Sequence, residues 1–169
     1  GLLGAAALLI GSPAAAIPDV VRPTATAGGS GGSPAGQNPE QQMDELFRMA
    51  EERLKQNPGD LKGWLLLARA KSSVGRFAEA LQAYEKATAL AADDADVWAD
   101  YADAAAGLAQ GRIDGQPITL VNKALAIDAR NPKALLLKGT WEIQQSQFAA
   151  AEKTFTLARS LVEPSSGFA

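Results

Sequence analysis

The residues of this chain whose types and spacing could support chemistry are acids that lie close together near its middle. They are Asp93, Asp94, Asp96, Asp100 and Asp103. A cation site is one interpretation, but no calcium-loop spacing with its glycine and distal glutamate follows. Carboxylates at the start of a helix cap free N–H groups and complement the helix dipole. We therefore favour capping for the first three, and keep Asp100 and Asp103, three residues apart, as candidate polar contacts for a partner.

Other catalytic chemistry has little support in the composition. The chain has no His and no Cys, which removes imidazole bases, thiol nucleophiles, soft metal ligands and disulfides together. Sixteen Lys and Arg against nineteen Asp and Glu give a net charge of −3, and no basic run could neutralise a row of phosphates. We expect no enzyme, no cofactor, no metal and no nucleic acid. A fragment of an enzyme whose active part lies upstream of Gly1 is the disfavoured alternative.

The two ends of the chain differ in composition from its middle. Residues 1–17 are almost wholly apolar, broken by Ser12 and Pro13, and indicate the remnant of a membrane anchor or signal peptide. A buried or disordered apolar arm is the alternative. Residues 18–39 are rich in Pro, Gly and Ser and predict a flexible linker. We expect residues 40–163 to form the folded domain and residues 164–169 a disordered tail.

The middle of the chain repeats itself with a period typical of paired helices. Helical periodicity begins after residue 40 and stops at Asn57-Pro58. Trp64 and Trp98 lie 34 residues apart, each followed by apolar and small residues, and a third copy at residues 134–139 follows after 37. Ala80 and Tyr84 are spaced as an Ala-x-x-x-aromatic pair, as are two residues near the C-terminus, Ala151 and Phe155. This pattern predicts tetratricopeptide repeats (TPR).

The fold class predicted is therefore all-α: a TPR α-solenoid of three helix pairs plus one leading helix. The middle repeat is irregular, because residues are inserted between 110 and 116 and Pro117 follows. We expect Pro117 in the first turn of a short helix over residues 117–128. The repeat register makes Trp64 and Trp98 packing residues, whereas Trp141 lies outside it and is a candidate contact.

Stacked helix pairs leave a concave surface that is lined by the first helix of each pair. Repeat positions 2, 5, 9 and 12 should face this surface. They are Lys62, Leu65, Arg69 and Ser72, then Asp96, Ala99, Asp103 and Ala106, then Lys133, Leu136, Thr140 and Ile143. Aliphatic residues mixed with both signs of charge suit an amphipathic helix or an extended peptide. A solvated helix face is the alternative for any one of them.

Several local stretches resemble one TPR family. They are residues 43–54 ending in Asn57-Pro58, residues 63–68 (GWLLLA), residues 99–104 (ADYADA), the loop Gly111-Arg112-x-x-Gly115-x-Pro117, and residues 131–135 (NPKAL). From about residue 41 to residue 161 the chain resembles the periplasmic TPR domain of the bacterial cytochrome c maturation apparatus, of the CcmI/CycH type. The irregular middle repeat is part of that resemblance.

The resemblance implies a function. It implies a chaperone on the periplasmic face of the inner membrane, anchored by the N-terminal segment, that holds apocytochrome c by its C-terminal helical segment. The haem-ligation complex would receive the client. A general TPR adaptor in another envelope or cytosolic complex is the alternative. A two-carboxylate clamp is disfavoured, because Leu65 and Arg69 stand where such a clamp has Lys and Asn.

Overall fold

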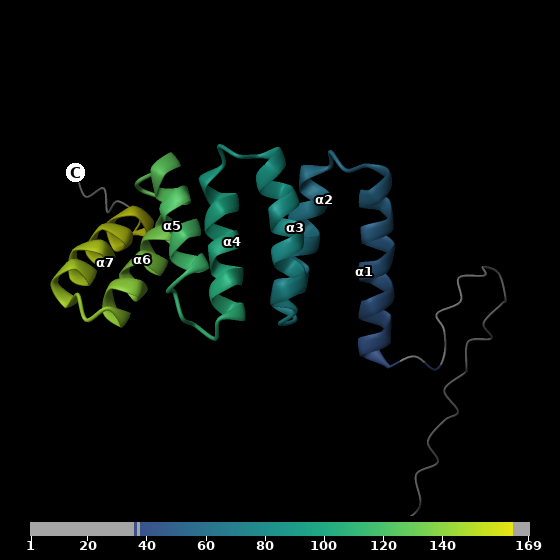
Figure 1. Cartoon of the computed structure of the whole chain (residues 1–169), viewed down its shortest axis with the longest axis horizontal. Coiled ribbons are helices and arrows are strands. Elements are labelled where there is room, and N and C mark those ends of the chain that lie inside the picture. The colour runs from purple at the N-terminus through teal and green to yellow at the C-terminus, as the bar shows by residue number, and fades with distance from the viewer. Residues whose placement is uncertain (1–35, 37, 164–169) are drawn as a thin grey trace, which may run out of the picture. The chain divides into compact units, whose positions relative to one another are not determined.

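A computed structural model describes residue 36 and residues 38–163, and within this part of the chain every regular element is a helix. The seven helices run in chain order as a row (Figure 1). They are α1 (Pro39–Gln56), α2 (Leu61–Ser73), α3 (Phe77–Leu90), α4 (Ala95–Leu108), α5 (Gln116–Ile127), α6 (Pro132–Gln144) and α7 (Phe148–Val162). The anchor, the tail and nearly all of the linker expected from the sequence lie outside the described residues.

The helices pack as three consecutive pairs behind a leading helix. α2 packs on α3, α4 on α5, and α6 on α7. Each later pair also contacts the one before it: α4 packs against both α3 and α2, and α6 against both α5 and α4. The predicted all-α solenoid of three pairs and one leading helix is confirmed.

The first helix of every pair begins at a short polar side chain that caps it. The Asp60 carboxylate accepts from the Gly63 N–H at 3.0 Å, and the Asn131 side chain accepts from the Ala134 N–H at 3.0 Å. Asp94 accepts two N–H bonds at the start of α4. Capping, rather than cation binding, therefore accounts for Asp94. Within the described part of the chain, no cluster of three acidic residues is placed to hold a metal ion.

The first helix of every pair also ends in the same left-handed turn. In each case the residue after the turn donates its N–H to a carbonyl five residues earlier, which is the pattern of a Schellman cap. The bonds are Arg76 to Lys71 at 2.8 Å, Gly111 to Ala106 at 2.8 Å, and Gln147 to Glu142 at 2.7 Å. The three first helices therefore end with the same backbone geometry.

The middle repeat departs from its neighbours after this turn. The second helices α3 and α7 begin directly after it, whereas α5 begins only at Gln116, with Pro117 in its first turn. The short helix expected over residues 117–128 is found one residue earlier, at Gln116–Ile127. Residues 112–115 form an added loop between α4 and α5.

Small residues and stacked rings let the helices approach closely. A Cβ atom added at Gly139 would lie 2.7 Å from the Phe155 ring, so only glycine allows this contact between α6 and α7. Tyr84 of α3 stacks on Tyr101 of α4 with ring centroids 5.8 Å apart. Trp64 packs partly buried against the core, as Trp98 does, which confirms packing roles for both.

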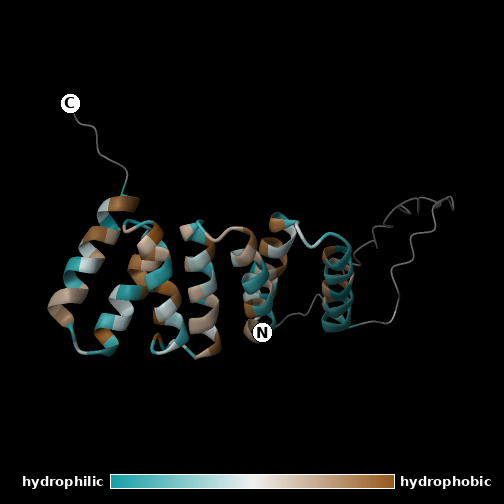
Figure 2. Cartoon of the chain, turned by 45° about the horizontal axis from the view of Figure 1, so that its top comes forward, coloured by the Kyte–Doolittle hydropathy of each residue, from teal (hydrophilic) through white to brown (hydrophobic). Residues whose placement is uncertain are grey.

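The leading helix α1 is attached through two buried side chains, Phe47 and Leu54, and through two ion pairs. Phe47 is buried, and Lys71 Nζ and the Arg76 guanidinium lie 5.6 and 5.3 Å from its ring centroid. Lys71 pairs with Glu51 and Arg76 with Asp44, both on α1. Figure 2 shows that the remainder of α1 is largely hydrophilic. None of the helices in residues 38–163 combines the length and the hydropathy needed to cross a membrane.

Truncating Phe47 to Ala should lower the free energy of unfolding by about 3 kcal/mol, because it removes a buried ring and leaves two cations without their π contact. Urea unfolding followed by circular dichroism measures this. Leu46→Ala, on the same helix but 60% exposed, is the matched control and should change stability by less than about 0.5 kcal/mol. Equal losses from both variants would contradict the anchoring role of Phe47.

Candidate protein-binding groove

A hollow runs along the first helices of all three pairs. We call it the central groove; it has a volume of about 800 Å³. It is lined by Arg69, Ser72, Ser73, Phe77, Tyr84, Asp100, Asp103, Ala104, Ala106, Gly107, Gly111, Ile113, Lys133, Leu137 and Thr140. Most of these residues belong to α2, α4 and α6. The repeat architecture therefore builds a continuous surface from segments that lie far apart in the sequence.

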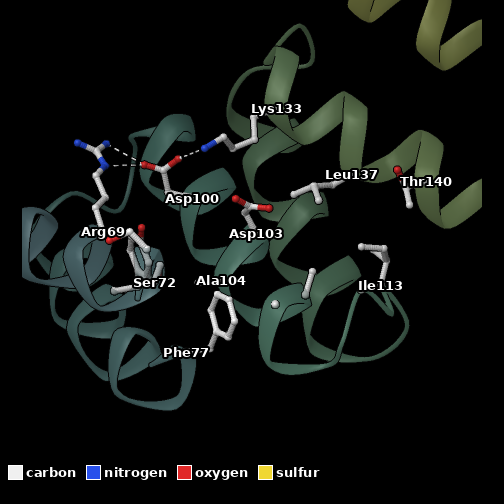
Figure 3. A pocket seen from close by; sticks show the side chains of 15 residues that line it. Arg69, Ser72, Phe77, Asp100, Asp103, Ala104, Ile113, Lys133, Leu137 and Thr140 are labelled. Atoms are coloured by element: carbon white, nitrogen blue, oxygen red, sulfur yellow. Dashed lines mark hydrogen bonds and ion pairs between the residues drawn. The ribbon is translucent and has the colours of Figure 1, made fainter. Parts of the chain in front are cut away.

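A single carboxylate ties the three helices of the groove together. Asp100 of α4 accepts from Arg69 of α2, at 3.0 Å from Nε and 2.7 Å from Nη2. It also accepts from Lys133 Nζ of α6 at 2.7 Å (Figure 3). The Asp100 side chain is 12% exposed, whereas both cations are about half exposed. Charge-assisted bonds of this kind are stronger than neutral ones, so Asp100 fixes the spacing of the three helices.

The charges in the groove are not all used up by this bridge. Asp103 follows Asp100 by one helical turn and is exposed in the groove (Figure 3). It makes no ion pair with any described residue. The apolar residues of the lining, which we call the apolar floor, include Phe77 and Leu137, together with the buried Ile113. The groove thus presents an apolar floor and one carboxylate that is free to meet a partner.

Tyr84 of α3 is a buried tyrosine that lines the central groove. Burial, and after it the negative charge of Asp100, raise the pKa of Tyr84 to about 12. Burial also raises the pKa of Tyr101, which stacks on it. Both phenols therefore stay neutral over the whole physiological range.

The added loop closes one end of the groove and is fastened to α6. Gln144 accepts from the Ile113 N–H at 2.9 Å and donates to the Gly111 carbonyl at 2.8 Å. The Trp141 indole and the Gln145 amide both donate to Asp114, at 2.9 and 2.8 Å. Ile113 is buried beneath these bonds. Trp141, outside the repeat register, is thus a loop anchor in the structure.

The residues expected on the concave surface fall into three groups. Six of them line the central groove: Arg69, Ser72, Asp103, Ala106, Lys133 and Thr140. Leu136 and Ile143 are exposed on α6 beside it, and Asp96 is exposed at the start of α4, where it accepts from Asn131. Ala99 is buried, Leu65 packs partly buried against the core, and Lys62 faces a different groove between α1 and α2.

Sequence reasoning did not name several groove residues. Phe77 and Tyr84 reach the groove from α3, and Leu137 lies one position beyond the expected Leu136. Ile113 comes from the added loop. The insertion itself was the one available signal for Ile113, because an inserted apolar residue in a polar loop needs a place to be buried.

The chain is similar to known proteins of one family. Residues 33–167 match the model of the family described as the cytochrome c-type biogenesis protein H TPR domain. Cytochrome c-type biogenesis protein CycH of Bradyrhizobium diazoefficiens is 30% identical over 106 residues, which are 63% of this chain and 27% of CycH. CcmH of Escherichia coli K12 is 25% identical over 73% of this chain and 35% of its own length.

A further relative is a subunit of a different assembly. The NrfG subunit of the formate-dependent nitrite reductase complex of Escherichia coli O157:H7 is 27% identical over 76% of this chain and 63% of its own length. The chain spans about a quarter to a third of the length of the CycH and CcmH relatives, and just under two thirds of NrfG.

Solved structures support the fold. A crystal structure of MamA superposes with a TM-score of 0.59 at 17% identity, covering 73% of this chain and 70% of MamA. MamA from Desulfovibrio magneticus RS-1 gives a TM-score of 0.60 at 19% identity, covering 72% of this chain and 67% of that one. At this level of identity the likeness concerns the helical-repeat fold alone.

The raised pKa of Tyr84 predicts alkaline sensitivity. An unfolded tyrosine ionises near pH 10, whereas Tyr84 in the folded chain ionises near pH 12. Below about pH 10 both states are protonated and stability is unaffected; between about pH 10 and 12 only the unfolded state loses the proton, so stability falls. Phenolate absorbance and urea unfolding between pH 8 and 11 measure this.

Tyr84→Phe should flatten the alkaline decline in stability. The native wild-type chain should show little phenolate absorbance at pH 10.5, while the urea-unfolded chain shows most of it. The chain has two tyrosines, so Tyr101→Phe isolates the signal of Tyr84. A native Tyr84 that titrates near pH 10 would show that it is not buried at the groove.

Proposed function

The chain belongs to the cytochrome c-type biogenesis protein H TPR-domain family, and from this membership we propose that its central groove holds the C-terminal helical segment of apocytochrome c for haem ligation. The observation that carries this proposal is the groove itself, shared by the first helices of all three pairs. A protein that holds an unfolded client needs a binding surface and does not need to catalyse a reaction.

The lining of the groove suits an amphipathic helix. Phe77 and Leu137, both partly exposed, offer apolar contacts for the apolar face of such a helix, and the buried Ile113 lies beneath the lining. Arg69 and Lys133 remain about half exposed despite their bonds to Asp100, so they can also meet polar groups at the edge of the client. Apolar contact would supply affinity and the charges would set orientation.

Selectivity for the unfolded client would follow from burial. In a folded cytochrome an amphipathic C-terminal helix hides its apolar face against the haem protein's own core, whereas in the apo form this face is available. The absence of Cys from the chain is consistent with this role, because the chain cannot form mixed disulfides with the thiols that bind haem. Haem attachment would then remain with the components of the haem-ligation complex, which we propose as further partners.

Location is part of the same proposal. The family acts in cytochrome c biogenesis, and we place the domain at the periplasmic face of the bacterial inner membrane. Residues 1–17 are proposed as the remnant of its anchor and residues 18–39 as the linker. This placement would expose the groove to the compartment in which apocytochromes mature.

The test is a binding measurement with a labelled peptide from the C-terminus of an apocytochrome c, using fluorescence anisotropy. The peptide should bind, and the folded holocytochrome should bind at least about tenfold more weakly. The double variant Leu136→Glu/Thr140→Glu places two charges on the α6 side of the groove, and should weaken binding by about tenfold or more while helical content stays unchanged.

Leu157→Glu, at a partly exposed leucine of α7 outside the groove, is the matched control and should bind as the wild type does. Equal affinity for the apo peptide and the holo protein would contradict the proposal. Binding of neither, together with capture of a different protein by the same groove, would favour the alternative of a general TPR adaptor.

A further inference from the structure

A second groove lies at the other side of α2, where the solenoid begins. We call it the α1–α2 groove; it has a volume of about 540 Å³. Its residues are Phe47, Ala50, Arg53, Leu54, Asp60, Lys62, Gly63, Leu66, Leu67 and Ala70. None of them lines the central groove, so the two surfaces are separate. This groove is independent of the proposed client site.

The packing rule of the solenoid identifies what this groove is shaped to hold. In the two later pairs, the first helix packs against the second helix and the first helix of the preceding pair. α2 packs against α1, which stands where the second helix of a preceding pair would be. No described helix stands where the first helix of that pair would be. The α1–α2 groove lies between the two helices that such a helix would contact.

The repeat register gives the same answer residue by residue. The 34-residue spacing of the tryptophans makes Leu66 equivalent to Asp100, and Asp100 contacts Arg69 on the preceding first helix. In α2 there is no preceding first helix among the described residues, and Leu66 is 73% exposed. Leu66 continues the apolar lining of the groove, and together they offer a contiguous surface on which another helix could pack.

The same register specifies a charge. Lys62 occupies the repeat position of Lys133, which pairs with Asp100 on the preceding first helix at 2.7 Å. Lys62 is exposed and makes no ion pair with any described residue, and neither does Arg53 across the groove. A helix seated here in the manner of α4 against α6 would bring a carboxylate to Lys62.

From this we propose that the α1–α2 groove binds an amphipathic helix of another polypeptide, with an apolar stripe against Leu66, Ala50 and Phe47 and a carboxylate against Lys62. The partner helix stands where the repeat register places a preceding first helix, and it extends the described solenoid by one pair. The protein thereby holds two polypeptides at once, one in each groove.

The probe is a peptide with the sequence of residues 95–108, acetylated and amidated at its ends. This helix already presents Asp100 to Lys133 in the folded chain, so it should present the same carboxylate to Lys62. Titration into isotope-labelled full chain is followed by nuclear magnetic resonance. We expect shifts of amides in α1 and α2, with a dissociation constant of about 0.1–1 mM, since so short a helix is only partly formed when free.

Charge reversal then tests the predicted pair. Lys62→Glu should weaken binding about threefold to tenfold, and a peptide carrying the change Asp100→Lys should restore it to that variant. Leu66→Glu should abolish the shifts, yet leave helical content intact because this side chain is exposed. Lys153→Glu, at an exposed lysine of α7, is the matched control and should bind as the wild type does.

Two results would overturn the proposal. The first is a set of peptide shifts confined to α4, α6 and the central groove, or none at all. The second is a wild-type dimer in sedimentation experiments that Leu66→Glu dissociates, which would assign the groove to a second copy of the chain. This test is independent of apocytochrome binding, because the α1–α2 groove and the central groove share no lining residue. A failure of the proposed function would therefore leave its outcome unchanged.

Discussion

The structure depends on one packing constraint: a first helix of a pair packs against the first helix before it as well as against its own partner, as α4 and α6 do. A solenoid has no central core, so each pair can bury its apolar face only on its neighbours. Asp100 makes this contact between pairs explicit, because one carboxylate joins α2, α4 and α6. Where the described helices meet this constraint they form the central groove. At α2 no described helix meets it, and the α1–α2 groove there has apolar residues and a lysine, Lys62, that makes no ion pair with a described residue.

The groove owes its character to how its charges are distributed. Asp100 is enclosed and satisfies two cations, so these three groups serve the architecture first. Asp103 and the apolar floor are left for recognition. A lining that mixes apolar residues with both signs of charge suits a ligand with an apolar and a polar side, as the proposed function requires.

Much of this fold could be predicted from the sequence, because its signals are local and repeated. The spacing of Trp64 and Trp98 gave the helix pairs, and Pro117 gave the start of the irregular helix. Contacts between distant segments could not be predicted in this way. Trp141 and Gln144 bond the added loop only because of the path that the loop takes, and the periodicity of the sequence does not specify that path. The pattern also placed Lys62 among the concave-face residues, and in the structure it lines the α1–α2 groove and not the central groove.

The fastening of the added loop to α6 has a consequence for how the domain unfolds. Repeat proteins behave approximately as a chain of nearest-neighbour units, so their ends can fray while the middle stays folded. Trp141, Gln144 and Gln145 make four hydrogen bonds with the segment that contains the added loop and joins the two helices of the second pair. These bonds connect the second pair to the third. They strengthen the coupling across one particular boundary. The last two pairs should therefore melt as a single cooperative block, with α1 left as the unit that opens first.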